Sequence, residues 1–189
     1  MPKRTPVILG AVLMLSALLL FLYNDGESDR AGEESRQILE VLHTATAPTT
    51  QATEETLAAV LPTMTVEDTA YIGYLVIADL KLELPVMARW DYEKLKTAPC
   101  RQAGSARTDD LVIAAHNYKT HFGSLSKLSP GAELLFTDVE GMEIRYTLKK
   151  LETVEPDAGE KVLDSGYDLV LYTCTPGGAA RIVAFFDRG

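Results

Sequence analysis

Seven short apolar runs between residues 71 and 186 constrain the fold of this chain most strongly. Turn pairs such as Pro130-Gly131 and Glu140-Gly141 separate several of them. Helical spacing is confined to two patches, Tyr92–Leu95 and Phe122–Leu128. Many short strands and few helices predict a mostly β barrel or sandwich. The runs are Tyr71–Ile77, Leu80–Val86, Leu111–His116, Ala132–Thr137, Glu143–Leu151, Asp168–Cys174 and Arg181–Phe186.

An uncharged apolar segment, Val7–Tyr23, precedes this region. At 1.5 Å per residue it spans roughly 25 Å as a helix, long enough to cross a membrane. Lys3 and Arg4 come before it and acidic residues follow, which places the N-terminus in the cytoplasm and the rest outside. A cleaved signal peptide is the alternative, but residues 21–25 lack a small-x-small cleavage site. We therefore expect an uncleaved transmembrane anchor in the cell membrane.

The anchor and the apolar runs divide the chain into three predicted parts. Residues 1–23 form the cytoplasmic tip and membrane helix, residues 24–66 an extracellular stalk, and residues 67–189 a catalytic β-barrel domain. Within the stalk, Glu33–Leu42 reads as a short helix, Thr44–Thr53 as a linker and Glu54–Leu61 as further helical turns. We favour a flexible spacer over a packed helix for the stalk.

Composition excludes several functions. A net charge of −9 argues against a nucleic-acid partner, because phosphate binding requires a basic face. The two cysteines, Cys100 and Cys174, imply no disulfide framework. With no clustered Cys/His set, we expect no metal site and no cofactor, and we expect Asp138 and Glu140 to be solvated turn residues.

Three reactive side chains stand at the ends of predicted strands. Cys174 closes one run, Arg181 opens the next, and His116 ends an earlier one. A thiol can act as nucleophile, an imidazole can move its proton, and a guanidinium can stabilise an oxyanion. Taken singly, each has a commoner role: a buried small hydrophobe, a core histidine or an edge-strand charge. Their joint placement favours thiol acyl transfer.

These residues resemble a known family. Leu171-Tyr172-Thr173-Cys174 is similar to the Leu-x-Thr-Cys signature of the sortases, which are membrane-anchored cysteine transpeptidases of mainly Gram-positive bacteria. His116 and Arg181 stand where the sortase histidine and arginine stand. Ile77–Val86, ending in Leu-Pro-Val, and Phe122–Leu128 followed by Gly131 also resemble the family. The pair His116-Asn117 is like class B, whereas Leu151–Tyr167 is short for a class B loop, so the subclass is class B-like or class D-like.

The resemblance implies a closed eight-stranded β-barrel with short helices, and a role for each residue. Cys174 would attack after the threonine of a C-terminal sorting motif in a secreted protein. His116 would serve as general acid and base, and Arg181 would stabilise the oxyanion and the substrate. Thr173 and Asn117 would contact the substrate. The acceptor amine would come from a peptidoglycan precursor or a pilin lysine.

Several alternatives stay open. His121 is a rival imidazole, less favoured because it follows the strand by several residues. Cys100 reads as a loop thiol outside the chemistry, and Trp90 and Tyr92 as residues that pack the first helical turn against the barrel. A membrane-tethered, non-catalytic β-domain that binds a cell-wall or protein ligand is the second functional hypothesis. A secreted cysteine hydrolase, with water as acceptor, is the third.

Overall fold

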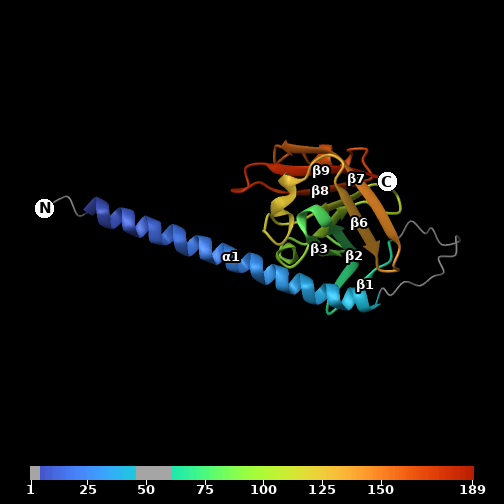
Figure 1. The fold of residues 1–189 in the computed structure, drawn as a ribbon, viewed down its shortest axis with the longest axis horizontal. Coiled ribbons are helices and arrows are strands. Elements are labelled where there is room, and N and C mark those ends of the chain that lie inside the picture. The colour runs from blue at the N-terminus through green and yellow to red at the C-terminus, as the bar shows by residue number, and fades with distance from the viewer. Residues whose placement is uncertain (1–4, 46–60) are drawn as a thin grey trace.

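A long helix and a β-barrel make up the structure, a computed structural model that describes residues 5–45 and 61–189. Helix α1 runs beside the barrel and extends well beyond it toward the N-terminus (Figure 1). The helices are α1 (Thr5–Ala45), α2 (Gly159–Leu163) and the 3₁₀ helices η1 (Ala78–Leu80), η2 (Lys94–Lys96) and η3 (Phe122–Lys127). The strands are β1 (Met64–Val66), β2 (Thr69–Ile77), β3 (Leu82–Met87), β4 (Cys100–Ala103), β5 (Leu111–Ala114), β6 (Glu133–Asp138), β7 (Glu143–Val154), β8 (Leu169–Cys174) and β9 (Arg181–Arg188).

The sheet closes on itself. Its order is β1-β2-β3-β4-β5-β8-β9-β7-β6, and β2 also pairs with β6. The strands from β2 round to β6 therefore form a closed barrel of eight strands, to which β1 adds a short extra strand along β2. This confirms the predicted eight-stranded barrel with short helices. Closure removes the exposed edges that an open sheet would leave.

Three apolar clusters hold the fold together. The largest fills the barrel and contains Phe122, Phe136, Tyr146 and Phe186, none of which is exposed. A second lies outside the barrel and joins Leu42 of α1 to strand residues that include Cys100. A third lies under α2, where Val162 packs against Val183 and Phe185. Because β7 alternates buried and exposed residues over its first half, one of its faces turns to the core.

All seven predicted runs overlap strands, but β1 and β4 were not predicted. Strand β4 is four residues long, carries Arg101 and Gln102, and has a register shift in its pairing with β5, so its sequence has no apolar alternation. The prediction that Cys100 lies in a loop was wrong. Cys100 begins β4, is fully buried, and lies 3.7 Å from the sulfur of Met87.

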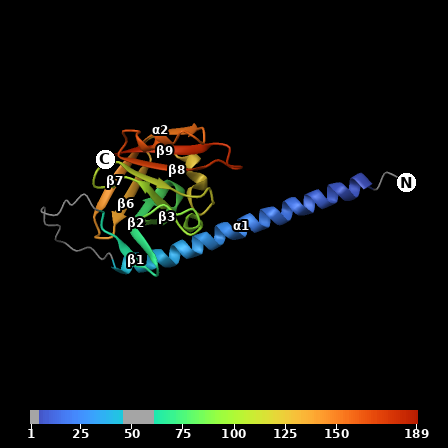
Figure 2. The same cartoon turned by 180° about the vertical axis from the view of Figure 1, so that it is seen from behind.

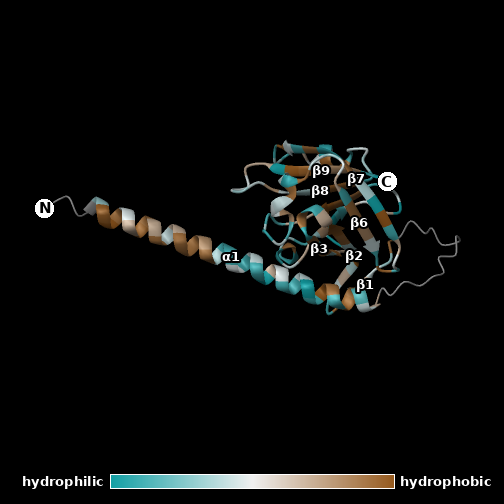
Figure 3. Ribbon diagram, in the orientation of Figure 1, coloured by the Kyte–Doolittle hydropathy of each residue, from teal (hydrophilic) through white to brown (hydrophobic). Residues whose placement is uncertain are grey.

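The first half of α1 is apolar on every side. Figure 3 shows this half as a continuous hydrophobic stretch that stands clear of the barrel. Its large apolar side chains from Val7 to Tyr23 are more than half exposed, and the helix is long and apolar enough to cross a membrane. The structure thus agrees with a single N-terminal anchor.

The second half of α1 packs against the barrel, which differs from the flexible spacer that we expected. The short helix predicted at Glu33–Leu42 is the end of one continuous helix reaching Ala45. One face of it is buried, with residues at helical spacing. Small and polar residues form the first part of this face, so its hydrophobic pattern is weak in sequence. The buried residues are Ser28, Ala31, Ser35, Leu39 and Leu42.

Most of the rest of the predicted stalk lies outside the described residues. The linker Thr44–Thr53 and the turns at Glu54–Leu61 fall almost entirely on residues 46–60, outside the described residues. Strand β1 falls inside the segment assigned to the stalk and joins the sheet. Figure 2 shows from behind that β1 and the end of α1 meet at one side of the barrel. The division into three parts stays a prediction.

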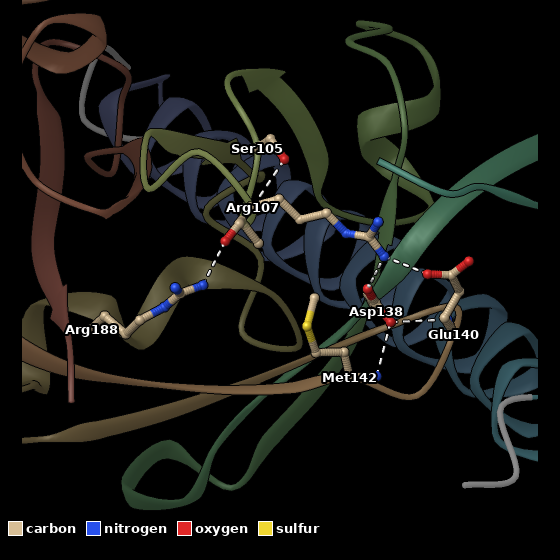
Figure 4. A network of polar contacts seen from close by, with 7 residues as sticks. Ser105, Arg107, Asp138, Glu140, Met142 and Arg188 are labelled. Carbon is tan, nitrogen blue, oxygen red and sulfur yellow. Dashed lines mark hydrogen bonds and ion pairs between the residues drawn. The ribbon is translucent and has the colours of Figure 1, made fainter. Parts of the chain in front are cut away.

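A buried ion pair fixes the turn between β6 and β7, contrary to our expectation for Asp138. Its carboxylate is fully buried, and Oδ1 accepts from the backbone N–H groups of Glu140 and Met142, each at 2.9 Å. The Arg107 guanidinium donates to Oδ2 at 3.1 Å and also to the exposed Glu140 carboxylate (Figure 4). Only Glu140 is a solvated turn residue. No sequence pattern indicates this pair, because Arg107 lies in a loop 31 residues before Asp138.

Candidate active site

Cys174 and Arg181 face each other across one hairpin. They are the last pair of the antiparallel β8–β9 ladder. The loop between them is closed by hydrogen bonds from Thr175 N to Ala180 O and from Gly178 N to Thr175 O. Gly177 and Gly178 have φ of 82° and 75°, a region that side chains other than glycine rarely adopt. Arg181 Nη1 donates to the carbonyls of Gly178 and Ala180, each at 3.1 Å, so the loop fixes the guanidinium.

His116 stands on the other side of Cys174. Strands β5 and β8 are parallel with a constant offset of 58 residues, from Leu111 opposite Leu169 to Ala114 opposite Tyr172. The same offset places His116, two residues past β5, level with Cys174. The chain keeps this alignment because Ala115 N donates to Tyr172 O at 3.2 Å and Thr173 Oγ1 to Ala115 O at 2.8 Å.

One cavity of about 320 Å³ holds all three side chains. A larger cavity of about 630 Å³, near Arg89 and Arg101, contains none of them. Trp90 and Tyr92 line the smaller cavity and are 44% and 64% exposed, so the prediction that they pack a helical turn onto the barrel was wrong. The other lining residues are Leu95, Gln102, Ala114, Ala115, Val154, Glu155, Pro156, Ala158, Gly159, Val162, Leu163, Tyr172 and Thr173.

Two tyrosines surround the His116 imidazole. Tyr118 stacks on it with ring centroids 4.9 Å apart, and Tyr92 meets it edge-on at 6.2 Å. Its Nε2 is buried and has no hydrogen-bond partner within the described residues. Burial lowers the pKa of His116 below its usual value, and the Lys96 ammonium lowers it further, while Glu27 acts in the opposite direction. The imidazole is therefore mainly neutral at neutral pH and can accept a proton.

The remaining predicted site residues lie at different depths. Thr173 is almost fully buried and its hydroxyl bonds to Ala115, so it mainly supports the site. Asn117 donates from Nδ2 to Thr175 O at 3.3 Å and is not among the residues that line the cavity. Cys100 is outside the cavity, and burial raises the pKa of its thiol to about 11. The sequence did not indicate that Tyr118 stacks on His116 or that α2 lines the cavity. The residues that surround them come from distant parts of the chain.

His121 is fully buried and away from the cavity. Its Nε2 lies 3.5 Å from Ser35 Oγ of α1, and its ring is 5.5 Å from that of Tyr118. Burial lowers its pKa from 6.5 to about 4, and the neighbouring His116 adds to this effect. His121 is thus held neutral between the barrel and α1.

We expect His121 to make folding stability depend on pH. Between pH 6.5 and 4 the unfolded chain protonates this imidazole and the folded chain does not, so stability falls as pH falls. The two pKa values correspond to about 3 kcal/mol. Chemical denaturation of the full chain in detergent at pH 7, 5.5 and 4.5 measures this. His121→Phe is expected to flatten the decline relative to wild type, whereas His43→Phe, which changes a half-exposed histidine, is not. Equal declines in all three proteins contradict the prediction.

The arrangement suits acyl transfer by a thiol nucleophile. A thiol, a neutral imidazole and a fixed guanidinium share one cavity on a rigid sheet. Among the described residues, no group of three or more His, Cys, Asp and Glu side chains could hold a metal ion.

The sequence model and the solved structures that match this chain belong to the same family. Residues 75–188 match the sequence model of the sortase domain. No curated protein matches the chain. Sortase C1 from Streptococcus agalactiae is similar in structure with a TM-score of 0.58 and 20% identity, over 85% of this chain and 86% of that one.

Two further solved structures are similar. SortaseC1 from Streptococcus suis has a TM-score of 0.55 and 23% identity, over 63% of this chain and 73% of its own. Sortase C from Clostridium perfringens has a TM-score of 0.54 and 18% identity, over 93% and 98%. At identities this low, the structural similarity establishes a shared fold and nothing further. The predicted subclass, class B-like or class D-like, stays a prediction.

Proposed function

The chain belongs to the sortase family, and on that basis we propose that it is a cysteine transpeptidase with Cys174 as nucleophile. The observation that carries the proposal is that Cys174, His116 and Arg181, which come from three different chain positions, line one cavity. The non-catalytic alternative expects these side chains to lie apart or to face the core. Their common cavity favours the enzyme.

The proposed reaction has two steps. Cys174 Sγ passes its proton to the neutral His116 imidazole and attacks the carbonyl carbon of a threonine in a C-terminal sorting motif. The oxyanion that forms is stabilised by the Arg181 guanidinium. The bond to the next residue breaks, His116 protonates the leaving amine, and a thioester remains. An acceptor amine then attacks the thioester and passes a proton to His116. The C–S bond breaks, the product leaves as an amide, and His116 returns the proton to the Cys174 sulfur.

The proposal also covers location and partners. With Lys3 and Arg4 on the cytoplasmic side, the barrel faces the outside of the cell membrane. The donor substrate is then a secreted protein with a sorting motif. The acceptor is an amine of a peptidoglycan precursor or of a pilin.

A product analysis tests the proposal. The full-length protein in detergent micelles is incubated with a panel of sorting-motif peptides, with and without a free amine, and its mass and products are measured. We expect a thioester on Cys174 and an amide product that forms only with the amine. Cleavage to the free acid alone supports the hydrolase hypothesis. No adduct on Cys174 across the panel contradicts the proposal and supports a binding domain.

A further inference from the structure

The loop that follows His116 is bound to α1 by a series of hydrogen bonds and ion pairs. Each of the four consecutive residues from Tyr118 to His121 has a polar contact with the helix. The pairs are Tyr118 with Glu27 at 3.3 Å, Lys119 with Asp25 at 2.8 Å and Asp29 at 2.9 Å, Thr120 with Ser28 at 2.7 Å, and His121 with Ser35 at 3.5 Å. The loop conformation is thus set by a helix outside the barrel.

Small residues on α1 permit this close approach. Ser28, Ala31 and Ser35 are at most 4% exposed, and Gly32 lies close to the Thr120 side chain. A Cβ on Gly32 would lie 2.8 Å from Thr120 Cγ2, closer than carbon atoms pack. Gly32 therefore leaves room for the Thr120 side chain at this contact, although helix propensity alone would favour alanine there.

Tyr118 connects this contact to the imidazole. One face of its ring stacks on His116, and its hydroxyl donates to Glu27 Oε2. The other carboxylate oxygen of Glu27 accepts from Tyr23 at 2.9 Å, at the end of the apolar segment. Because His116 Nε2 has no hydrogen-bond partner among the described residues, ring packing has a large part in orienting the imidazole.

We propose that α1 helps to form the active site: Glu27 and Gly32 of the helix hold the loop after β5 so that Tyr118 positions the His116 imidazole. The proposal rests on the proposed function only for the chemical role of His116. Tyr118, Glu27 and Gly32 are positioning residues and touch no reacting atom. Glu27 is four residues past Tyr23, about 6 Å along the helix. The end of the apolar segment is therefore connected to the imidazole through only Glu27 and Tyr118.

Several charged and titratable groups face this imidazole. Glu27 comes from α1 and Lys96 from η2, and the two have opposite effects on the pKa of His116. Tyr92 and Tyr118 contact the ring, while Cys174 and Arg181 share its cavity. Removing the Glu27 charge leaves the effects of burial and Lys96 unopposed. Glu27→Gln should therefore lower the pKa of His116 further.

The first experiment needs no catalysis. Full-length protein with ¹³C-labelled histidine is placed in lipid nanodiscs, and the signals of the three histidines are assigned by substitution and followed against pH. Glu27→Gln is expected to move the His116 midpoint to lower pH. Tyr118→Leu and Gly32→Leu are expected to shift the His116 signal itself, since ring stacking is lost. Glu40→Gln, at an exposed position on the same helix, is the control and is expected to match wild type.

Kinetics give the second readout. Tyr118→Leu and Gly32→Leu are expected to lower kcat by about 10- to 100-fold with little change in KM for the peptide. Tyr118→Phe keeps the stack but loses the hydrogen bond to Glu27, so its kcat is expected to lie between those of Tyr118→Leu and wild type. Wild-type His116 signals in Glu27→Gln, Tyr118→Leu and Gly32→Leu overturn the proposal. So does an unchanged kcat in variants whose His116 signal has moved. If wild type is inactive, the proposed function fails, and the spectra still decide whether α1 positions His116.

Discussion

Replacing Cys174 by alanine is expected to reduce thioester formation and peptide cleavage by about 10⁴-fold or more. The proposed nucleophile is the one thiol among the described residues that line the cavity, and it lies at the end of β8, opposite Arg181 and level with His116. Removal of a nucleophile leaves only binding and oxyanion stabilisation, and such residual catalysis is small. Single-turnover cleavage of a sorting-motif peptide, followed by mass spectrometry, measures the effect.

Cys100 provides the matched control. It is the other cysteine of the chain, but it is fully buried, lies outside the cavity, and remains a protonated thiol at neutral pH because burial raises its pKa to about 11. Cys100→Ala should therefore keep the wild-type cleavage rate. Comparable losses in the two variants, or wild-type cleavage by Cys174→Ala, would show that Cys174 is not the nucleophile.

Much of the barrel was predictable because its strands are short apolar runs bounded by turn residues. Strand β4 was not, since Arg101 and Gln102 break the apolar pattern and its pairing includes a register shift. The docking of α1 was also missed. Ser28 and Ser35 look solvent-facing in sequence. The loop after β5 and Thr97 at the end of η2 make them interface residues in the fold.

The site was predictable in part for a similar reason. Cys174 and Arg181 flank a single hairpin, so their proximity follows from local sequence once the turn is recognised. His116 comes beside them through a parallel pairing across 58 residues, which only the family resemblance indicated. Tyr118 carried a weak signal, an aromatic residue two positions after the histidine. Nothing in the sequence associated it with Glu27, which lies 91 residues away.

Asp138→Ala is expected to lower the free energy of unfolding by about 3 to 5 kcal/mol, the largest stability effect that we predict. Its carboxylate is fully buried, accepts two backbone hydrogen bonds in the β6–β7 turn, and pairs with the nearly buried Arg107 guanidinium. Alanine would leave two turn N–H groups without an acceptor and a buried cation with only the exposed Glu140 carboxylate. Removing one partner of a buried ion pair has a cost of this size.

Two further variants distinguish the buried pair from the turn as a whole. Glu140→Gln changes the solvated partner of the same arginine and is expected to cost less than about 1 kcal/mol. The double variant Arg107→Met with Asp138→Leu removes both buried charges, and is expected to be more stable than Asp138→Ala because no unpaired cation remains. Denaturation of the full chain in detergent, followed by the fluorescence of its single tryptophan, measures all three. If Asp138→Ala costs no more than Glu140→Gln, the pair does not hold the turn, and the backbone hydrogen bonds and barrel packing alone must stabilise it.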